Sequence, residues 1–375
     1  MTAPRIVVIG LGATGSAALH HLARRGVHAI GVEQFDIGHD RGSSHGPTRI
    51  FRLAHFENPS YVALMRSAHV LWRELETSTN LKLLHTTGIV EIGPAQSGLV
   101  RGTITASRDH NLRYETMDAA TLMRRYPSYR MPDDFIAVWQ QDGGFIEAEA
   151  AIAAQLRLST DAGAQVRTNE KVLAVKPSRQ GVGIKTDRDL IEADGAIIAA
   201  GPWLGALLPQ LHLPARVTRQ TVCWFEPNDA AQFTADRFPV FLLETQYGLH
   251  YGFPAYGASG VKVAKHHHLD EVVTPETCER NVSARDVAAV RAPLSQYLPA
   301  ADGRLFDAQT CLYTMTPDET FIIDRMPEFS HVVIASPCCG HGFKFSPVIG
   351  EIVADLATTG STAHDISRFR LSRFG

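Results

Sequence analysis

The sequence predicts a mixed α/β fold, in which a Rossmann-like dinucleotide-binding domain carries an inserted domain built on an antiparallel sheet. Three observations predict it. A glycine-rich fingerprint follows an apolar run at the start of the chain, and a second apolar run meets a glycine turn at residues 196–201. Residues 221–260 have a different texture, rich in aromatic residues, Gly and Pro with strand-like stretches. The first two patterns are typical of parallel strands in α/β proteins, and the third is typical of an antiparallel sheet.

The first strand and the turn after it carry the most informative local pattern. Residues 5–9 form a short run rich in β-branched residues, which predicts a parallel strand covered on both faces. Gly10, Gly12 and Gly15 follow with the spacing GxGxxG, and residues 16–26 continue at helical spacing. These glycines permit a tight turn and the close approach of a pyrophosphate, while the helix N-terminus offers free N–H groups to the anion. The pattern therefore predicts a dinucleotide site.

The second strand, residues 29–33, ends in an acidic residue, Glu33. A carboxylate at this place accepts a hydrogen bond from a ribose hydroxyl, which favours FAD or NAD over NADP. An NAD dehydrogenase would fit this first fingerprint alone.

Periodicity and turn residues predict the elements that follow. An apolar stripe at helical spacing over residues 61–75 indicates the buried face of a helix. A second helix is expected from 148 to 159, ending near Gly163. Short apolar runs predict strands at 172–175, 183–185 and 196–201. The last of these is expected to be a second parallel strand that meets the cofactor at its glycine turn.

Composition excludes several classes of protein. The 375 residues are 45% hydrophobic and carry a formal net charge of −3 without basic blocks, which argues against nucleic acid or an anionic membrane surface as a partner. No apolar run approaches the ~20 residues that span a bilayer. A strand begins within a few residues of the start, so no signal peptide is expected. Five irregularly spaced cysteines favour a reduced, cytoplasmic protein.

Four longer motifs carry a family resemblance. They lie at residues 42–52, 251–254, 310–324 and 340–345, and each is far more specific than GxGxxG. With them the chain resembles the monomeric sarcosine oxidase and N-methyltryptophan oxidase family, flavoenzymes that oxidise secondary amino acids. The resemblance runs from the first strand to about Arg368. It implies FAD as the cofactor, a small amino acid and O2 as reaction partners, and a monomer.

The resemblance also implies roles for individual residues. Cys311 would form a thioether to the flavin ring, Arg52 and Lys344 would bind the substrate carboxylate, and Lys262 would activate oxygen. Five further residues are expected to line the substrate cavity or to lie against the flavin. Tyr251 would bind substrate, and the other four would have catalytic roles: His266, Tyr313, His45 and Arg49. Residues expected to contact FAD are Gly10, Gly12, Gly15, Glu33, Ser43, Thr48, Val172, Cys311, Gly340, Gly342, Phe343 and Lys344.

Taken without the resemblance, the same residues have plainer interpretations. Arg49 and Arg52 could lie on a solvated turn, and Lys262 alternates with two valines like an outward-facing strand residue. The three histidines at 266–268 do not predict a metal site, because adjacent side chains cannot converge on one ion in regular structure. The remaining candidates alone would be core aromatics, a hydrogen-bonded histidine or a buried thiol: Tyr251, Tyr313, His45 and Cys311.

The chain departs from the family pattern at several points. Residues 336–339 read Ser-Pro-Cys-Cys where the family has Ala-Gly-Phe-Ser, which brings two more thiols close to the flavin segment. We choose Cys311 as the anchor, because the long run around it matches the attachment motif. Ser44 replaces one of two paired histidines in the family, while His250 and Leu242 replace an aromatic residue and Met. These changes are expected to touch the pocket and to leave the substrate side chain open.

The predicted organisation is an FAD-binding domain formed by residues 1–85, 146–220 and 310–375, with a substrate-binding domain formed by residues 86–145 and 221–309.

The predicted activity is oxidation of N-methyl or other secondary α-amino acids by FAD and O2. The products are H2O2 and an imine that hydrolyses, releasing formaldehyde from N-methyl substrates. Alternatives are oxidation of cyclic imino acids such as pipecolate or proline, oxidation of glycated amino acids, a flavin dehydrogenase with another acceptor, and a non-catalytic flavin-binding module.

Overall fold

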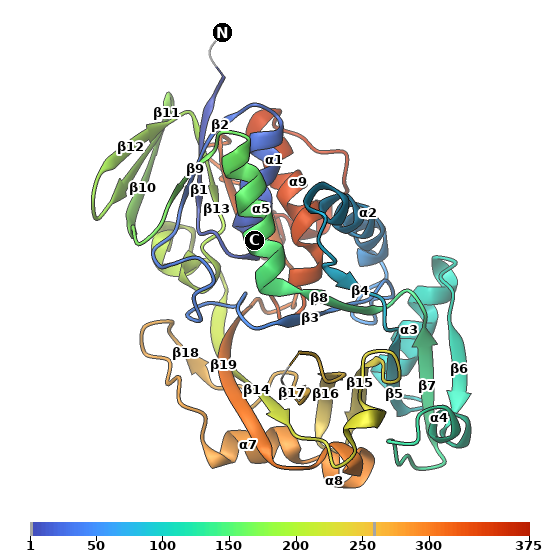
Figure 1. Cartoon of the computed structure of the whole chain (residues 1–375). Helices are drawn as coiled ribbons and strands as arrows, with labels where there is room; N and C mark the ends of the chain where they lie inside the picture. Colours follow the sequence, from blue (N-terminus) through green and yellow to red (C-terminus); the bar gives the residue numbers. More distant parts are fainter. Residues whose placement is uncertain (1–2, 258–259) are drawn as a thin grey trace.

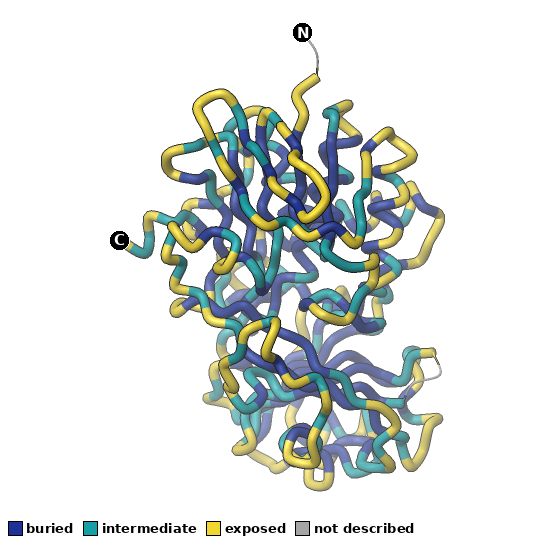
Figure 2. Tube along the Cα trace, turned by 90° about the vertical axis from the view of Figure 1, so that its left-hand side faces the viewer, coloured by how far each residue is buried: buried dark blue, intermediate teal, exposed yellow. Residues whose placement is uncertain are grey.

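The computed structural model describes residues 3–257 and 260–375, which form two regions, one above the other in Figure 1. Within these residues the upper region is built on a six-stranded sheet and the lower region on a nine-stranded sheet. In Figure 2 the buried parts of the chain run through the middle of both regions, and the exposed parts are mostly loops at the periphery. The mixed α/β prediction is confirmed.

The six-stranded sheet has the order β20-β21-β13-β1-β2-β9. Its strands are parallel except at β20, which runs antiparallel to β21. The strands span Arg5–Ile9 (β1), His28–Val32 (β2), Gln165–Arg167 (β9), Gly195–Ile198 (β13), Ile322–Arg325 (β20) and Val332–Ser336 (β21). The sheet thus draws on three stretches of chain that are far apart in sequence. The exact domain boundaries stay a prediction.

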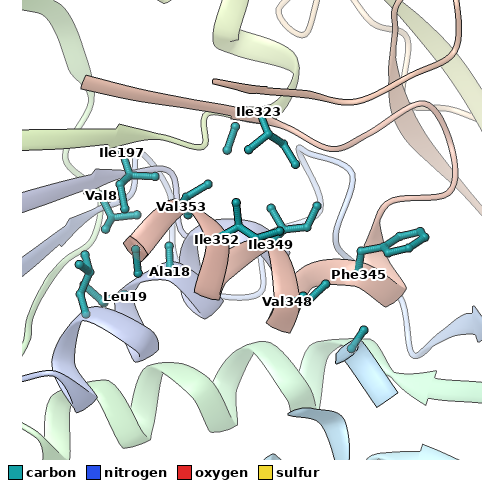
Figure 3. Close-up of a cluster of buried hydrophobic side chains, with 14 of the residues drawn as sticks. Val8, Ala18, Leu19, Ile197, Ile323, Phe345, Val348, Ile349, Ile352 and Val353 are labelled. Carbon is teal, nitrogen blue, oxygen red and sulfur yellow. The ribbon is translucent and has the colours of Figure 1, made fainter. Parts of the chain in front are cut away.

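Helices cover one face of this sheet (Figure 1). Figure 3 shows the core that results: Val8 and Ile197 from the sheet meet Leu19 of α1 and Val353 of α9. The helices α1 and α9 approach closely at Gly350, which lacks a Cβ. A Cβ there would lie only 2.5 Å from the Cβ of Ala17. The helices of this region span Ala13–Arg24 (α1), Tyr61–Thr79 (α2), Ala148–Asp161 (α5) and Ser346–Thr358 (α9), with a short helix Leu204–Leu207 (α6).

A small antiparallel sheet covers the other face of the six-stranded sheet and closes a second apolar core there. Its strands are Val172–Ser178 (β10), Gly181–Thr186 (β11) and Leu190–Ala193 (β12).

The lower sheet has the order β18-β14-β17-β16-β15-β5-β7-β6, with β19 paired to β14. It is antiparallel except where β15 runs parallel to β5, and it extends beyond the predicted segment 221–260 at both ends. Its strands are Ile89–Pro94 (β5), Glu115–Asp118 (β6), Phe135–Gln140 (β7), Arg216–Phe225 (β14), Val240–Thr245 (β15), Gly248–Phe253 (β16), Val261–Lys265 (β17), Val272–Val273 (β18) and Leu305–Met315 (β19). Its helices are Gly98–Asp109 (α3), Ala119–Arg125 (α4), Ala284–Arg291 (α7) and Leu294–Tyr297 (α8).

A third sheet lies where the two regions meet (Figure 1) and consists of Thr48–Phe51 (β3), Leu84–His85 (β4) and Gly144–Glu147 (β8). Together with the inner face of the nine-stranded sheet it forms the junction at which the predicted site residues gather. Among the described residues, no helix combines the length and apolar character needed to cross a membrane.

Candidate functional site

One cavity of about 480 Å³ runs between the two large sheets and is lined by residues from both. It brings together segments as distant as Gly10 and Lys344. The predicted site residues that line it are Gly10, Gly12, Glu33, Ser43, His45, Thr48, Arg49, Arg52, Val172, Tyr251, Lys262, His266, Cys311, Tyr313, Gly340, Gly342, Phe343 and Lys344. Gly15 lies behind this lining, inside the first turn of α1.

The glycine loop at one end of the cavity is a cradle that side chains would fill. Gly10 has φ +85°, and a Cβ there would lie 2.6 Å from the carbonyl oxygen of Ala199. A Cβ on Gly15 would lie only 1.7 Å from the carbonyl oxygen of Gly10, so helix and strand approach too closely for any side chain. This is the glycine pattern that lets backbone N–H groups reach a pyrophosphate.

Glu33 is fixed beside that loop. Its carboxylate accepts hydrogen bonds from the N–H of Leu11 at 2.8 Å and of Phe35 at 3.2 Å. It is buried and lines the cavity, as the ribose-binding prediction requires. The cradle and this acceptor fit the dinucleotide part of FAD.

Lys262 is buried in the cavity wall and not on the surface, which corrects the interpretation from strand alternation. Only 4% of the residue is exposed, and its Nζ donates to the carbonyl oxygen of Thr48 at 2.7 Å. The rings of Phe253 and Trp224 lie 4.7 and 5.4 Å from Nζ. Burial, assisted by Arg49, holds the pKa of Lys262 well below its usual value. The alternation misleads because β17 is an inner strand, so its second face lines the cavity and not solvent.

Arg49 is tied to the backbone of the loop before β3. Its guanidinium donates to the carbonyl oxygens of Thr48 at 2.9 Å, of Ser43 at 3.1 Å and of His45. Burial, followed by the charge of Arg49, lowers the pKa of His45 to about 4. The loop therefore presents a fixed cation and a neutral imidazole to the cavity.

Arg52 lies deep in the site, but one nitrogen of its guanidinium already holds a carboxylate of the chain. One nitrogen donates to the carbonyl oxygen of Ala54 at 2.7 Å, and the other donates to Glu57 Oε2 at 2.7 Å. A second carboxylate, Glu91, lies 3.8 Å from Arg52. Neither acid is among the residues predicted from sequence, although Glu57 follows Arg52 by only five residues.

Lys344 joins Arg52 in the same cavity despite the long chain between them. Its Nζ donates to the carbonyl oxygen of His341 at 2.7 Å. Burial, followed by the nearby charge of Arg52, lowers the pKa of Lys344 to about 7, while Glu57 opposes the shift. The indole of Trp72 donates to the carbonyl oxygen of Lys344 at 2.8 Å and so anchors this segment to α2.

Tyr251, Tyr313 and His266 form a neutral wall. The side chains of Tyr251 and Tyr313 influence each other, and burial raises the pKa of Tyr251 to about 12. The rings of His266 and Tyr313 are 5.7 Å apart, and burial, followed by His267, lowers the pKa of His266 to about 3. Gly340 permits this contact, because a Cβ there would lie 2.5 Å from the Tyr313 ring.

The cavity separates the three candidate thiols. Cys311 and Cys338 both line it, whereas Cys339 turns into a separate apolar cluster. The sulfur of Cys339 lies 3.4 Å from Thr316 Oγ1, and Cys339 is only 1% exposed. Cys339 is therefore no candidate for flavin attachment.

Cys311 lies on β19, opposite Gln220 of β14. Burial raises the pKa of its thiol, while Arg49 and Lys262 act in the opposite direction. The cations thus favour the thiolate in an otherwise unfavourable setting.

One of the substitutions that were expected to touch the pocket lies elsewhere. Leu242 lines the cavity, but His250 is fully buried and makes ring-nitrogen contacts with the carbonyl oxygens of Ala289 at 3.1 Å and Gly248 at 3.3 Å. Successive strand residues face opposite sides, so His250 points away from the cavity that Tyr251 faces. The expectation that His250 touches the pocket is wrong.

The histidines at 266–268 diverge. His266 lines the cavity, whereas His268 contacts Asp286 with 2.9 Å between Nε2 and Oδ1. Within residues 3–257 and 260–375, no group of three or more His, Cys, Asp or Glu side chains could hold a metal ion.

Comparisons with known proteins agree with this geometry. Residues 5–356 match the family described as FAD dependent oxidoreductase. A monomeric sarcosine oxidase of Streptomyces avermitilis is 38% identical over 369 residues, covering 97% of this chain and 96% of that protein. An N-methyl-L-tryptophan oxidase of Salmonella dublin is 36% identical over 371 residues, covering 98% of each. The solved structure of NikD, described as an unusual amino acid oxidase, superimposes with a TM-score of 0.87 at 28% identity, covering 99% and 98% of the two chains.

Proposed function

The chain belongs to the FAD-dependent oxidoreductase family, and on that premise we propose that it oxidises N-methyl or other secondary α-amino acids with O2 as acceptor. Relatives that are 36–38% identical over nearly their whole length carry the names sarcosine oxidase and N-methyl-L-tryptophan oxidase. The single observation that carries the proposal is the meeting of Arg52, Lys344 and Lys262 in one buried cavity.

The cofactor assignment rests on the cradle. Gly10, Gly12 and Glu33 would hold the dinucleotide part of FAD, and the segments that begin at Ser43 and Gly340 would hold the remainder. When bound, FAD supplies the acceptor for the two electrons and the hydrogen that leave the C–H bond beside the amine nitrogen.

The cationic pair binds the substrate carboxylate. Arg52 offers a planar fork and Lys344 a point charge, a combination that fixes a carboxylate in both position and orientation. Because Glu57 already pairs with one nitrogen of Arg52, the substrate carboxylate would add a further anion beside Glu57 at the same guanidinium. His266 stays neutral at working pH, so its ring can accept a hydrogen bond beside the substrate without adding a charge.

Lys262 assists the oxygen step. Its Nζ is held by Thr48, so the ammonium needs no reorganisation when negative charge develops on oxygen. Burial depresses the pKa of Lys262, and an anion formed next to it favours the charged form of the side chain.

Covalent attachment through Cys311 is part of the proposal. Formation of the thioether replaces a C–H bond of the flavin and the S–H bond of Cys311 by one C–S bond. Two protons and two electrons would leave, and O2 would take them up as H2O2. The burial of Cys311 in the cavity, near Arg49 and Lys262, supports this choice.

Two coarser features complete the proposal. We infer a monomer, because the sarcosine oxidase relatives are named monomeric. We also infer a cytoplasmic location, which the five free cysteines support.

The decisive test is a peroxide-coupled screen of the purified yellow protein with N-methyl amino acids, cyclic imino acids and glycated amino acids. H2O2 with stoichiometric formaldehyde is expected from N-methyl substrates. If only cyclic imino acids or only glycated amino acids give H2O2, that class would be the substrate in place of N-methyl amino acids. Reduction of the flavin without oxygen consumption would indicate a dehydrogenase, and no reduction by any of them would indicate a binding module.

A further inference from the structure

Glu91 is a buried carboxylate that the proposed reaction does not use. It lies on β5 with 0% exposure, and its Oε1 is 3.8 Å from Nη1 of Arg52. Within the described part of the chain, neither carboxylate oxygen makes a well-formed hydrogen bond, although the Thr103 hydroxyl, which is itself unpartnered, lies close enough to act on Glu91. A buried carboxylate without hydrogen bonds is costly in its charged form unless a cation compensates it. The charge of Glu91 must therefore depend on what else surrounds Arg52.

The surroundings of Glu91 hold two cations and one further acid. The groups that act on it come from the segment after β3, from the segment after Gly342, and from α3: Arg52, Glu57, Lys344 and Thr103. On the neighbouring strand β15 the carboxylate of Glu244 is engaged elsewhere, by the N–H of Leu99 at 3.0 Å. Burial raises the pKa of Glu91 to about 7, and Arg52 is the strongest opposing influence.

A bound substrate would bring a third carboxylate to these two cations. Glu57 can share its charge with solvent, because its side chain is 20% exposed, whereas that of Glu91 is fully enclosed. A second anion at the same guanidinium disfavours the charged form of the enclosed acid. We propose that Glu91 takes up a proton from solvent when the substrate carboxylate binds to Arg52 and Lys344. An O–H bond forms on Glu91 with a proton from solvent, and no group is oxidised or reduced. This inference rests on the proposed function.

Glu91 thereby acts on the substrate through Arg52 and not by direct contact. It is charged in the free protein and neutral in the complex, so it offsets the charge that the substrate carboxylate brings to Arg52. The consequence is a linkage between ligand affinity and pH. Well below pH 7 Glu91 already holds its proton, so binding adds little proton to Glu91 there. Above pH 7 binding must draw a proton from solvent, so the dissociation constant should rise by up to about tenfold per pH unit. Lys344 has a pKa of about 7 and adds an effect of the same sign, so a variant must separate the two.

The experiment is calorimetric titration of the FAD-loaded protein with acetate at pH 6 and pH 8, in buffers of different ionisation enthalpy. This counts the protons taken up per acetate bound. Glu91→Gln is the test variant, because Gln has the shape of the protonated acid that the protein already holds at low pH. Proton uptake at pH 8 should fall by about one proton in this variant. Glu244→Gln, on the adjacent strand, is the matched control and should behave as wild type.

The outcomes distinguish this inference from the function on which it rests. Failure of the wild type to bind acetate or any other simple carboxylate removes the carboxylate site, and with it both proposals. Binding without proton uptake at pH 8 overturns the role of Glu91 and leaves the proposed function standing. Unchanged uptake in Glu91→Gln does the same, because the proton would then reside on Lys344 or elsewhere.

Discussion

The two ends of the cavity solve the problem of binding an anion in different ways. The cradle at Gly10–Gly15 uses backbone N–H groups and a helix N-terminus, so it holds negative charge without burying a charged side chain. The opposite end uses buried side chains, Arg52, Lys344 and Lys262, whose ammonium and guanidinium groups would be unfavourable alone. Each of these side chains donates hydrogen bonds to carbonyl oxygens or to acidic side chains of the protein. Anion binding at the cradle should therefore depend little on nearby charged side chains, whereas anion binding at the opposite end should depend strongly on them.

The largest effect is expected at Cys311, which would bind the flavin covalently at the end of the cavity that carries Arg52, Lys344 and Lys262. Cys311→Ala should release all flavin colour into the supernatant after acid precipitation, whereas the wild-type precipitate should stay yellow. Cys338→Ala, in the same cavity, is the control and should keep its colour. Release from Cys338→Ala with retention in Cys311→Ala would transfer the attachment to the other thiol.

Lys262 should show the next largest effect. Lys262→Met removes a preplaced amino group whose charged form is favoured by an anion beside it, so reoxidation of the reduced protein by O2 should slow about 10²–10³-fold. Reduction by substrate should change far less, and stopped-flow absorbance measures both steps. Lys265→Met, on the same strand but outside the cavity lining, should leave both rates unaltered. Equal slowing of the two half-reactions in Lys262→Met would contradict the assignment.

The carboxylate clamp should follow. Replacing either partner of the pair should weaken a carboxylate ligand by roughly 2–5 kcal/mol, which is ~30-fold to several thousand-fold in affinity. Arg52→Lys should also be impaired, because the charge remains but the planar fork is lost. Flavin-absorbance titration with acetate compares wild type, Arg52→Lys, Arg52→Ala and Lys344→Ala. Arg125→Lys, which changes an arginine stacked on Trp139 outside the cavity, serves as control. Equal dissociation constants throughout would place the carboxylate elsewhere.

The same contrast explains what sequence reasoning could predict. The cradle depends on local backbone geometry, so Gly10, Gly15 and Glu33 leave a short readable pattern. The charged end depends on how distant strands meet, so alternation around Lys262 could not distinguish solvent from an internal cavity. Only the family motifs pointed to it.

Other features of the charged end had no local signal at all. Glu57 and Glu91 are ordinary acids in sequence. Glu57 pairs with Arg52 within one loop segment, whereas Glu91 reaches Arg52 only after β5 packs against the segment that follows β3. The misplacement of His250 was avoidable in principle. Once Tyr251 is assigned to the cavity, strand geometry sends its neighbour to the opposite face.

The smallest expected effect concerns the cradle itself. In Gly15→Ala the new Cβ would meet the carbonyl oxygen of Gly10 at 1.7 Å, so backbone must shift, at about 1–3 kcal/mol of unfolding free energy. Urea denaturation measures this, and Gly98→Ala, where a Cβ meets nothing within 4 Å, is the matched control. In a Cys311→Ala background Gly15→Ala should also weaken FAD binding. A loss of stability without a loss of FAD affinity would mean that this glycine serves helix packing alone, and that the backbone cradle ends at Gly12.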